Sequence, residues 1–261
     1  MKRFILKVLR KFVQLIAKSN SKLPAILEID IQNMQGKGSG GSSTEVEAKM
    51  ALDFLSRRGI NSPIVLDIGA NIGSYSEAIK KFAPQASIFA FEPSSVARKK
   101  LEDKFIGNNS VVIVPLALGS AISKGTLWSD TPGSGLASLT KRSLEHFGTK
   151  FNQSETVNVA TLDSWAESTK VVPNLVKMDV EGHEWDVLRG GLETLAHTQV
   201  VQFEFGGCNI DTRTFFQDFW YLLTEAGFSL YRISGDGPIH IPQYSEQDEC
   251  FRTTNYLAVR E

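Results

Sequence analysis

Two acidic residues in the first half of the chain stand where a nucleoside could be bound. Asp67 lies inside the apolar run IVLDI and is followed by Gly69 and Gly73, and Glu92 ends a second apolar run, nineteen residues after Gly73. Glycines let the backbone turn tightly and come close to a ligand. An acid at the end of the second strand of a nucleotide-binding fold accepts hydrogen bonds from ribose hydroxyls. The spacing therefore predicts a crevice for a nucleoside that carries a charged tail.

The residues around this turn separate two classes of cofactor. A dinucleotide fold uses Gly-x-Gly-x-x-Gly to bring its backbone against a pyrophosphate, whereas this chain has only Gly69 and Gly73, with Asn71 between them. The carboxylate of Asp67 would repel a pyrophosphate but would attract a ligand with an ammonium or sulfonium group. The sequence thus favours S-adenosylmethionine over NAD.

A second group of acidic residues lies in the later half of the chain and could take part in proton transfer. Asp179 and Glu181 follow an apolar run, and Glu204 lies near the end of another. We expect Asp179 beside the reacting group and treat all three carboxylates as candidate catalytic residues. They could also share a proton or bind Mg²⁺, but no dedicated ligand spacing is present, and we expect no resident metal. His183 carries an imidazole suited to proton transfer near neutral pH; the alternative is a packed or solvated turn residue.

Apolar runs of strand length alternate with helical segments along most of the chain. This alternation predicts a parallel sheet with right-handed crossovers, and strands that are apolar throughout predict helices on both faces. We therefore expect an α/β doubly wound (Rossmann-like) sheet of about seven strands, mostly parallel. The expected strands span residues 64–68, 87–91, 111–114, 175–178, 200–205, 229–233 and 256–260, and the main expected helices span 74–82, 94–105, 185–196 and 215–226.

The segment between the third and fourth expected strands, residues 120–170, is too long for a bare loop. Residues 125–128 and 156–159 alternate in polarity and are expected to pair as an antiparallel extension. Residues 131–139, rich in Gly, Ser and Pro, could form a lid over the substrate. Trp128 could offer a face to a sugar ring, or it could simply pack the extension.

The first 43 residues differ in character from the rest of the chain. Residues 1–18 have apolar side chains at helical spacing with Lys and Arg opposite them, which predicts a basic amphipathic helix. Its charges are too frequent for a membrane span. Three roles stay open: packing on the domain or on a second subunit, contact with an anionic lipid surface, or targeting. Residues 35–43 suggest a flexible Gly/Ser linker, and we expect one domain over residues 44–261.

The charge balance and the cysteine content limit the expected binding partners and the expected cellular compartment. The 28 Lys and Arg against 29 Asp and Glu give no overall field for nucleic acid, so we expect no nucleic-acid partner. Cys208 and Cys250 match no zinc or redox spacing, which favours a reducing, cytoplasmic location. Peripheral membrane association through residues 1–18 stays open, as does the oligomeric state.

The sequence resembles the FkbM family of S-adenosylmethionine-dependent methyltransferases in five blocks that occur in the family's order. The blocks are VLDIGANIG at 65–73, FEP at 91–93, ALG at 117–119, TLD at 161–163 and VKMDVEGHE at 176–184. The resemblance implies the class I methyltransferase fold, with an antiparallel last strand. It also implies methyl transfer to a hydroxyl of a sugar, a glycan or a small natural product.

The resemblance also implies which residues contact the cofactor. The turn after the first strand would hold the methionyl part, Glu92 the ribose, and the ends of the second and third strands the adenosine. The implied cofactor-binding residues are Asp67, Gly69, Ala70, Asn71, Gly73, Tyr75, Glu92, Pro93, Ser94, Leu116, Ala117 and Asp179.

Two other functions remain open from the sequence. Gly69, Gly73 and Glu92 would permit a nucleotide-dependent oxidoreductase, although Asp67 and the missing third glycine oppose it. A non-catalytic nucleotide-binding protein on the same fold would bind the cofactor without turnover.

Overall fold

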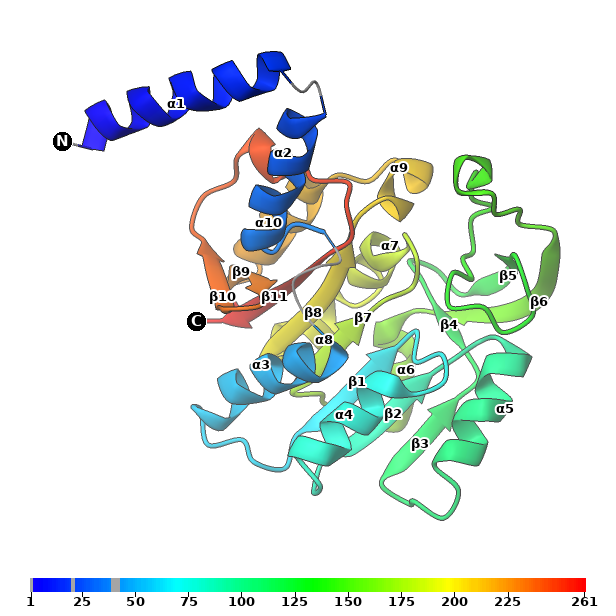
Figure 1. The fold of residues 1–261 in the computed structure, drawn as a ribbon. Coiled ribbons are helices and arrows are strands. Elements are labelled where there is room, and N and C mark those ends of the chain that lie inside the picture. The colour runs from blue at the N-terminus through cyan, green and yellow to red at the C-terminus, as the bar shows by residue number, and fades with distance from the viewer. Residues whose placement is uncertain (1, 20–21, 39–42) are drawn as a thin grey trace.

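A computed structural model of the chain describes residues 2–19, 22–38 and 43–261. Within these residues the main feature is an eight-stranded sheet in the order β10-β9-β11-β8-β7-β1-β2-β3 (Figure 1). Its strands are β1 (Ile64–Ile68), β2 (Ser87–Phe91), β3 (Val111–Val114), β7 (Leu175–Met178), β8 (Val200–Phe205), β9 (Phe228–Ser234), β10 (Gly237–Ile241) and β11 (Thr254–Arg260). From β3 to β8 the neighbouring strands run parallel, whereas β11 is antiparallel to both β8 and β9. The expected doubly wound, mostly parallel sheet with an antiparallel last strand is confirmed.

The sheet in the described part of the chain has one strand more than the seven expected. The extra strand is β10, which pairs antiparallel with β9 and forms the edge of the sheet. It begins with Gly237 and Pro238, residues that usually signal a turn. Proline is tolerated there because an edge strand has one side without a hydrogen-bonding neighbour.

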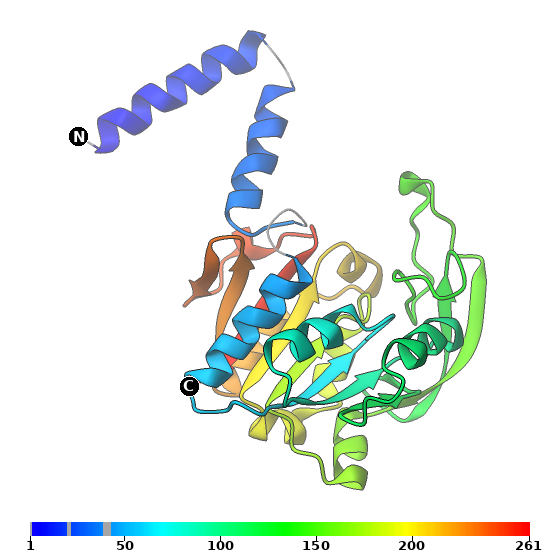
Figure 2. The same cartoon turned by 60° about the horizontal axis from the view of Figure 1, so that its bottom comes forward.

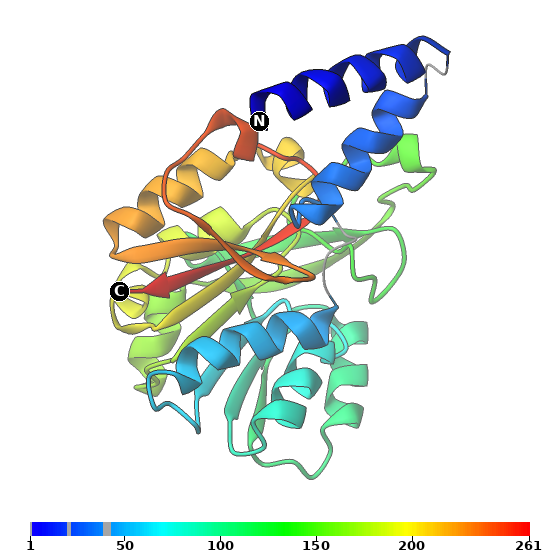
Figure 3. The same ribbon diagram turned by 60° about the vertical axis from the view of Figure 1, so that its left-hand side comes forward.

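Helices cover both faces of the sheet (Figures 2 and 3). One face carries α3 (Thr44–Ser56), α4 (Ser74–Phe82) and α5 (Ser95–Lys104), and the other carries α6 (Leu162–Thr169), α7 (Glu184–Arg189), α8 (Leu192–His197) and α10 (Phe216–Glu225). Successive strand residues enter the two cores in turn: Val65 packs beneath α3 and α4, and Leu66 packs beneath the helices of the opposite face. This alternation explains why the central strands are apolar throughout.

The helix expected at residues 185–196 is instead two short helices, α7 and α8. The break falls at Gly190 and Gly191, where the chain comes close to other segments. A Cβ on Gly190 would lie 2.1 Å from the carbonyl oxygen of Gly119, and one on Gly191 would lie 2.7 Å from the side chain of Leu162. Close backbone packing therefore interrupts a helix whose apolar periodicity continues across the break.

A second, three-stranded sheet forms within the described part of the 120–170 insertion and the residues just before it. It contains β4 (Ala117–Leu118), β5 (Ser123–Ser129) and β6 (Gln153–Ala160), in the order β4-β6-β5. The expected antiparallel pairing is confirmed, with Gly125 opposite Val157. Trp128 forms a backbone bridge with Ser138, and its ring lies 4.9 Å from Nζ of Lys141, so it packs within this extension.

The N-terminal residues form two helices, α1 (Lys2–Ser19) and α2 (Leu23–Met34), and no described helix is both long enough and apolar enough to cross a bilayer. Residues 36–38, which we expected in a flexible linker, pack against the sheet instead. Lys37 is buried and donates to the carbonyl of Gln247, and the N–H of Gly38 donates to Oγ1 of Thr254 at 3.1 Å. Residues 39–42 of that expected linker lie outside the described residues.

Candidate active site

A cavity opens at the carboxyl ends of β1, β2 and β7, where parallel α/β sheets bind their ligands. It encloses about 570 Å³ outside the protein atoms, including its mouth. Nine of the expected site residues line it: Gly69, Asn71, Glu92, Pro93, Leu116, Ala117, Asp179, Glu181 and His183. The expected lid contributes Ser134, Gly135, Ala137 and Leu139. The other expected residues lie outside the lining of this described cavity: Asp67, Ala70, Gly73, Tyr75, Ser94 and Glu204.

The turn after β1 lies directly against the end of β7. Gly69 has φ +76°, and a Cβ there would lie 1.9 Å from the carbonyl oxygen of Asp179, so only glycine fits. Gly73 has φ +83°, and a Cβ there would meet Leu101 of α5 at 2.5 Å. Asn71, between them, lines the cavity, and its buried Oδ1 has no hydrogen-bond partner among the described residues. Such an acceptor is costly unless a ligand donates to it.

Glu92 directly follows β2 and lines the cavity, although the residue is only 6% exposed. Its Oε2 accepts from the N–H of Asn71 at 2.8 Å, and its Oε1 accepts from the N–H of Ser94 at 2.7 Å. Burial raises the pKa of Glu92 to about 7, although these two hydrogen bonds lower it. Each oxygen keeps a further lone pair, so the carboxylate can still accept two ribose hydroxyls. Glu92 and Asn71 therefore offer free acceptor atoms to a ligand that carries hydroxyl or N–H donors.

Asp67 does not face the cavity, contrary to our expectation. Its side chain is 0% exposed, and its Oδ2 accepts from the N–H of Ser76 at 3.2 Å and from the hydroxyl of Ser76 at 2.7 Å. Its Oδ1 lies 3.1 Å from Nζ of Lys177, the residue opposite it in the β1–β7 pairing. A carboxylate this deep needs such compensation. The charge of Asp67 is therefore balanced inside the protein, so Asp67 alone cannot attract a cationic ligand to the mouth.

Lys177 is a site residue that motif spacing did not identify. Its Nζ donates to the carbonyl of Gly69 at 3.2 Å and lies 3.6 Å from Oδ2 of Asp179. Burial lowers the pKa of Lys177, but the carboxylates of Asp67 and Asp179 outweigh burial and raise the pKa above its ordinary value. The charged ammonium group therefore connects the turn after β1 to the turn after β7. A lysine inside an otherwise apolar strand was the available signal.

Tyr75 also lies behind the cavity wall rather than in it. Its hydroxyl donates to Oε1 of Gln202 at 2.7 Å, and Nε2 of Gln202 donates to Oε2 of Glu47 at 3.1 Å. Nζ of Lys177 lies 5.5 Å from the centre of the Tyr75 ring. The first turn of α4 thus directs Tyr75 into a buried polar network that surrounds Lys177 instead of toward a ligand.

Carboxylates converge beside the turn after β7. One oxygen from each of Asp179, Glu181 and Glu204 lies within 4.8 Å of the others. The side chain of Asp179 is 41% exposed, whereas those of the other two residues are more deeply placed. Burial and the charge of Asp179 raise the pKa of Glu181 to about 7, against the lowering effect of Arg142. Burial, together with Asp179 and Glu181, raises the pKa of Glu204 well above its ordinary value. Glu181 and Glu204 therefore bind a proton more tightly than exposed carboxyl groups do.

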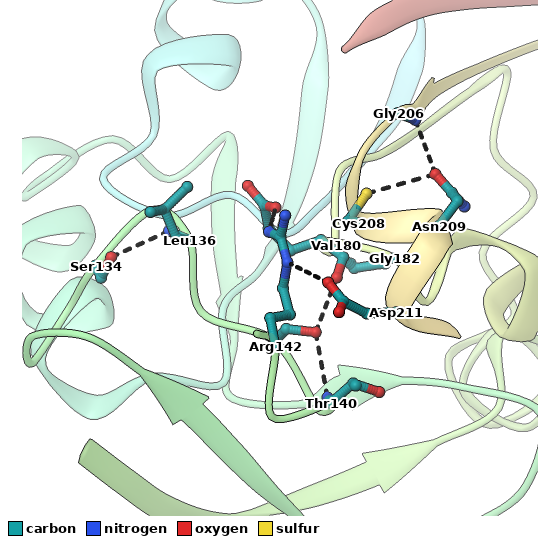
Figure 4. Close-up of polar contacts among 12 residues, drawn as sticks. Ser134, Leu136, Thr140, Arg142, Val180, Gly182, Gly206, Cys208, Asn209 and Asp211 are labelled. Carbon is teal, nitrogen blue, oxygen red and sulfur yellow. Dashed lines mark hydrogen bonds and ion pairs between the residues drawn. The ribbon is translucent and has the colours of Figure 1, made fainter. Parts of the chain in front are cut away.

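Arg142 follows the expected lid (residues 131–139) and was not identified from the sequence; Figure 4 shows it beside Asp211. Its Nη1 is paired with Oε2 of Glu181, and its Nε lies 3.3 Å from Oδ2 of Asp211 in α9 (Cys208–Thr212). Nearby, the hydroxyl of Ser138 donates to the carbonyl of Glu181 at 2.8 Å. These contacts hold residues 138–142 against the acidic turn.

His183 has a partner at each ring nitrogen. Nδ1 lies 2.9 Å from Oδ2 of Asp186, and Nε2 lies 2.9 Å from Oγ1 of Thr140. The imidazole is thus fixed between Asp186 of α7 and Thr140, an arrangement that suits positioning of Thr140 better than proton abstraction. The neighbouring Glu184 is fully buried and accepts from the N–H of Gly182 at 3.0 Å, which holds the acidic turn in shape.

Comparison with known proteins places this site in a family. The model of the methyltransferase FkbM domain matches residues 67–230. A curated relative, 2-O-methyltransferase NoeI of Sinorhizobium fredii, is 28% identical over 153 residues, which are 55% of this chain and 63% of the relative. Another, hexuronic acid methyltransferase AglP of Haloferax volcanii, is 30% identical over 167 residues, which are 64% of this chain and 63% of the relative.

A solved structure of methyltransferase FkbM from Methylobacillus flagellatus superposes with a TM-score of 0.48 and 15% identity, over 76% of this chain and 44% of the other. The chain spans less than two thirds of the length of either curated relative. The domain match covers more than half of the chain, and the chain therefore belongs to the FkbM methyltransferase family.

Proposed function

We propose that the domain over residues 44–261 transfers a methyl group from S-adenosylmethionine to a hydroxyl of a sugar, a glycan or a small natural product. The observation that carries this proposal is one cavity with two chemically different sides. On one side, Glu92 can accept hydrogen bonds from a ribose and Asn71 from an amino group. On the other side, the carboxylate of Asp179 can stabilise a cation and that of Glu181 can accept a proton.

The β1 and β2 side of the cavity would hold the methyl donor. The remaining lone pairs of Glu92 accept from the ribose hydroxyls, and the unpaired Oδ1 of Asn71 accepts from the ammonium group. Pro93, Leu116 and Ala117 form an apolar surface for the adenine. Bound in this way, S-adenosylmethionine supplies an electrophilic methyl group next to a sulfonium charge.

Asp179 is the carboxylate that we place nearest to that charge. It lines the cavity at the end of β7, and Lys177 lies behind it, between Asp179 and Asp67. Two carboxylates share one ammonium group in this row, so a net negative charge is left, and Asp179 presents it to the cavity. A cation bound in a cavity of this sign is stabilised by the remaining charge.

Glu181 would accept the proton that the acceptor hydroxyl loses as its oxygen is methylated. Its pKa of about 7 lies near the operating pH, where a general base is most effective. Arg142 fixes the orientation of this carboxylate and favours its ionised form. Alignment of the acceptor between the lid and the acidic turn supplies much of the remaining rate enhancement.

The names of the two relatives, a 2-O-methyltransferase and a hexuronic acid methyltransferase, support a saccharide acceptor. Methyl transfer from radiolabelled S-adenosylmethionine to a panel of free and conjugated saccharides, with uronic acids included, tests this acceptor class. Labelling only of non-saccharide alcohols would contradict it.

Calorimetry separates this reaction from the two alternatives that the sequence left open. S-adenosylmethionine and S-adenosylhomocysteine are expected to bind and NAD is not. Binding of NAD alone would favour an oxidoreductase. Binding of S-adenosylmethionine without transfer to any acceptor in the panel would favour the non-catalytic protein.

A further inference from the structure

Helix α1 carries a charge of one sign and a broad apolar surface. Its sequence KRFILKVLRKFVQLIAKS holds six Lys and Arg and no acidic residue. Lys7, Arg10, Gln14 and Lys18 follow one another at spacings of three or four residues, so they share one side of the helix. Val8, Phe12 and other apolar residues occupy the opposite side. This arrangement is typical of helices that lie in the plane of a membrane surface.

The apolar side of α1 is not covered by the domain. Phe12 is 62% exposed and Leu15 is 73% exposed, and Ile5, Val8 and Leu9 are each about half exposed. Figures 1 and 2 show α1 extending away from the body at the end of α2. An apolar surface of this extent is unfavourable in contact with water unless a partner covers it.

Charge distinguishes an anionic surface from a second copy of the chain as that partner. The residues after α1 contain 22 Lys and Arg against 29 Asp and Glu, so the body is acidic while α1 is wholly basic. Pairing of α1 with another α1 would bring twelve like charges together, whereas anionic headgroups attract every one of them. We propose that α1 lies in the headgroup region of a bilayer that contains anionic phospholipids, with its apolar side inserted and its basic side toward the phosphates.

The attachment of this helical pair to the body agrees with such a role. The N–H of Gly38 donates a hydrogen bond to Oγ1 of Thr254. Thr254 lies opposite Phe205, at the carboxyl end of β8. β8 is parallel to β7, so α2 leaves the body at the same edge of the sheet where the cavity opens. Membrane contact through α1 therefore brings that edge, and not the opposite one, toward the lipid.

Vesicle flotation of the full-length chain tests the proposal. We expect binding to phosphatidylcholine vesicles that contain phosphatidylglycerol, little binding to phosphatidylcholine alone, and release as NaCl approaches about 1 M, where charges are screened within about 3 Å. Phe12→Glu and Gln14→Glu change the net charge equally but place the carboxylate on opposite sides of α1. Gln14→Glu should weaken binding about fivefold, through charge alone. Phe12→Glu should weaken it at least another tenfold, because an apolar side chain no longer inserts.

Unchanged urea midpoints for both variants would show that the body stays folded, so their difference reports on α1 alone. Equal loss of binding in the two variants, or equal binding to both kinds of vesicle, would overturn the proposal. So would a dimer in sedimentation that Phe12→Glu dissociates, if the wild-type chain does not float with the anionic vesicles.

Discussion

Replacement of Lys177 by methionine is expected to destabilise the fold, because it removes a buried cation from between two carboxylates. Lys177 and Asp67 lie opposite each other in β7 and β1, and their side chains are 8% and 0% exposed. Methionine is also unbranched and fills a similar space, so the change mainly removes charge. Asp67 would then keep its bonds to Ser76 but would lose the cation beside its Oδ1. The carbonyl of Gly69 would lose a donor as well.

The expected loss is large relative to the stability of a typical domain. Breaking a buried ion pair by removing one partner costs about 3–5 kcal/mol, out of a total of about 5–15 kcal/mol. Adding Asp67→Asn to Lys177→Met removes the stranded charge, so the double variant should regain most of that loss. The pKa of Lys177 is raised in the folded protein, so its contribution is complete at neutral pH and disappears only as the pH rises through that raised value.

Urea unfolding followed by circular dichroism at neutral pH measures these differences. For a slope of about 3 kcal/mol per M, the midpoint of Lys177→Met should fall by about 1 M or more. Lys99→Met is the matched control, because Lys99 pairs with Asp103 on an exposed face of α5, where ion pairs contribute little. Equal shifts for Lys177→Met and Lys99→Met, or a double variant no more stable than Lys177→Met, would show that Lys177 does not compensate the buried charge of Asp67.

Glu92→Gln is expected to weaken S-adenosylhomocysteine binding about 100-fold in calorimetry, because charge-assisted bonds to two hydroxyls are lost. Asp179→Asn should weaken the binding of S-adenosylmethionine more than that of S-adenosylhomocysteine, which lacks the sulfonium charge. An equal loss of affinity for both would contradict the placement of Asp179 next to the sulfonium group. The transfer rate should rise with pH through about 7 as Glu181 ionises, and Glu181→Gln should remove that rise and lower kcat by about 10²–10⁴. EDTA should leave the rate unchanged, because the raised pKa values of Glu181 and Glu204 oppose metal binding; loss of activity that Mg²⁺ restores would contradict this.

The central strands could be predicted because burial on both faces makes each of them a short apolar run between polar residues and turns. β1, β2, β3, β7 and β8 begin and end where the sequence placed them. The turn after β1 was equally readable, since Gly69 leaves no room for a side chain. Local patterns sufficed there because burial on both faces and close backbone approach each restrict the residue types within a short stretch of sequence.

The charged contacts could not be predicted in the same way, because they depend on distant segments. Asp67 and Lys177 become neighbours only when β7 lies beside β1 in the observed register. Each is the second-last residue of an apolar strand, so the strand order would have been enough to pair them. Arg142 lies in an irregular segment without periodicity, and its pairing with Glu181 depends on the path of the chain between β5 and β6.

The buried Asp67–Lys177 pair changes which carboxylate would attract a cationic ligand. Asp67 is neutralised by Lys177, and Glu181 is paired with Arg142. Of the three carboxylates Asp67, Glu181 and Asp179, Asp179 is therefore the one whose charge is least compensated. It is also the most exposed carboxylate among them. Asp67 therefore acts indirectly: it holds the ammonium group of Lys177, which in turn donates to the carbonyl of Gly69 and lies 3.6 Å from Oδ2 of Asp179 at the cavity wall. On this view the attraction for a sulfonium group belongs to the end of β7, and Asp67 provides the fixed charge that makes it possible.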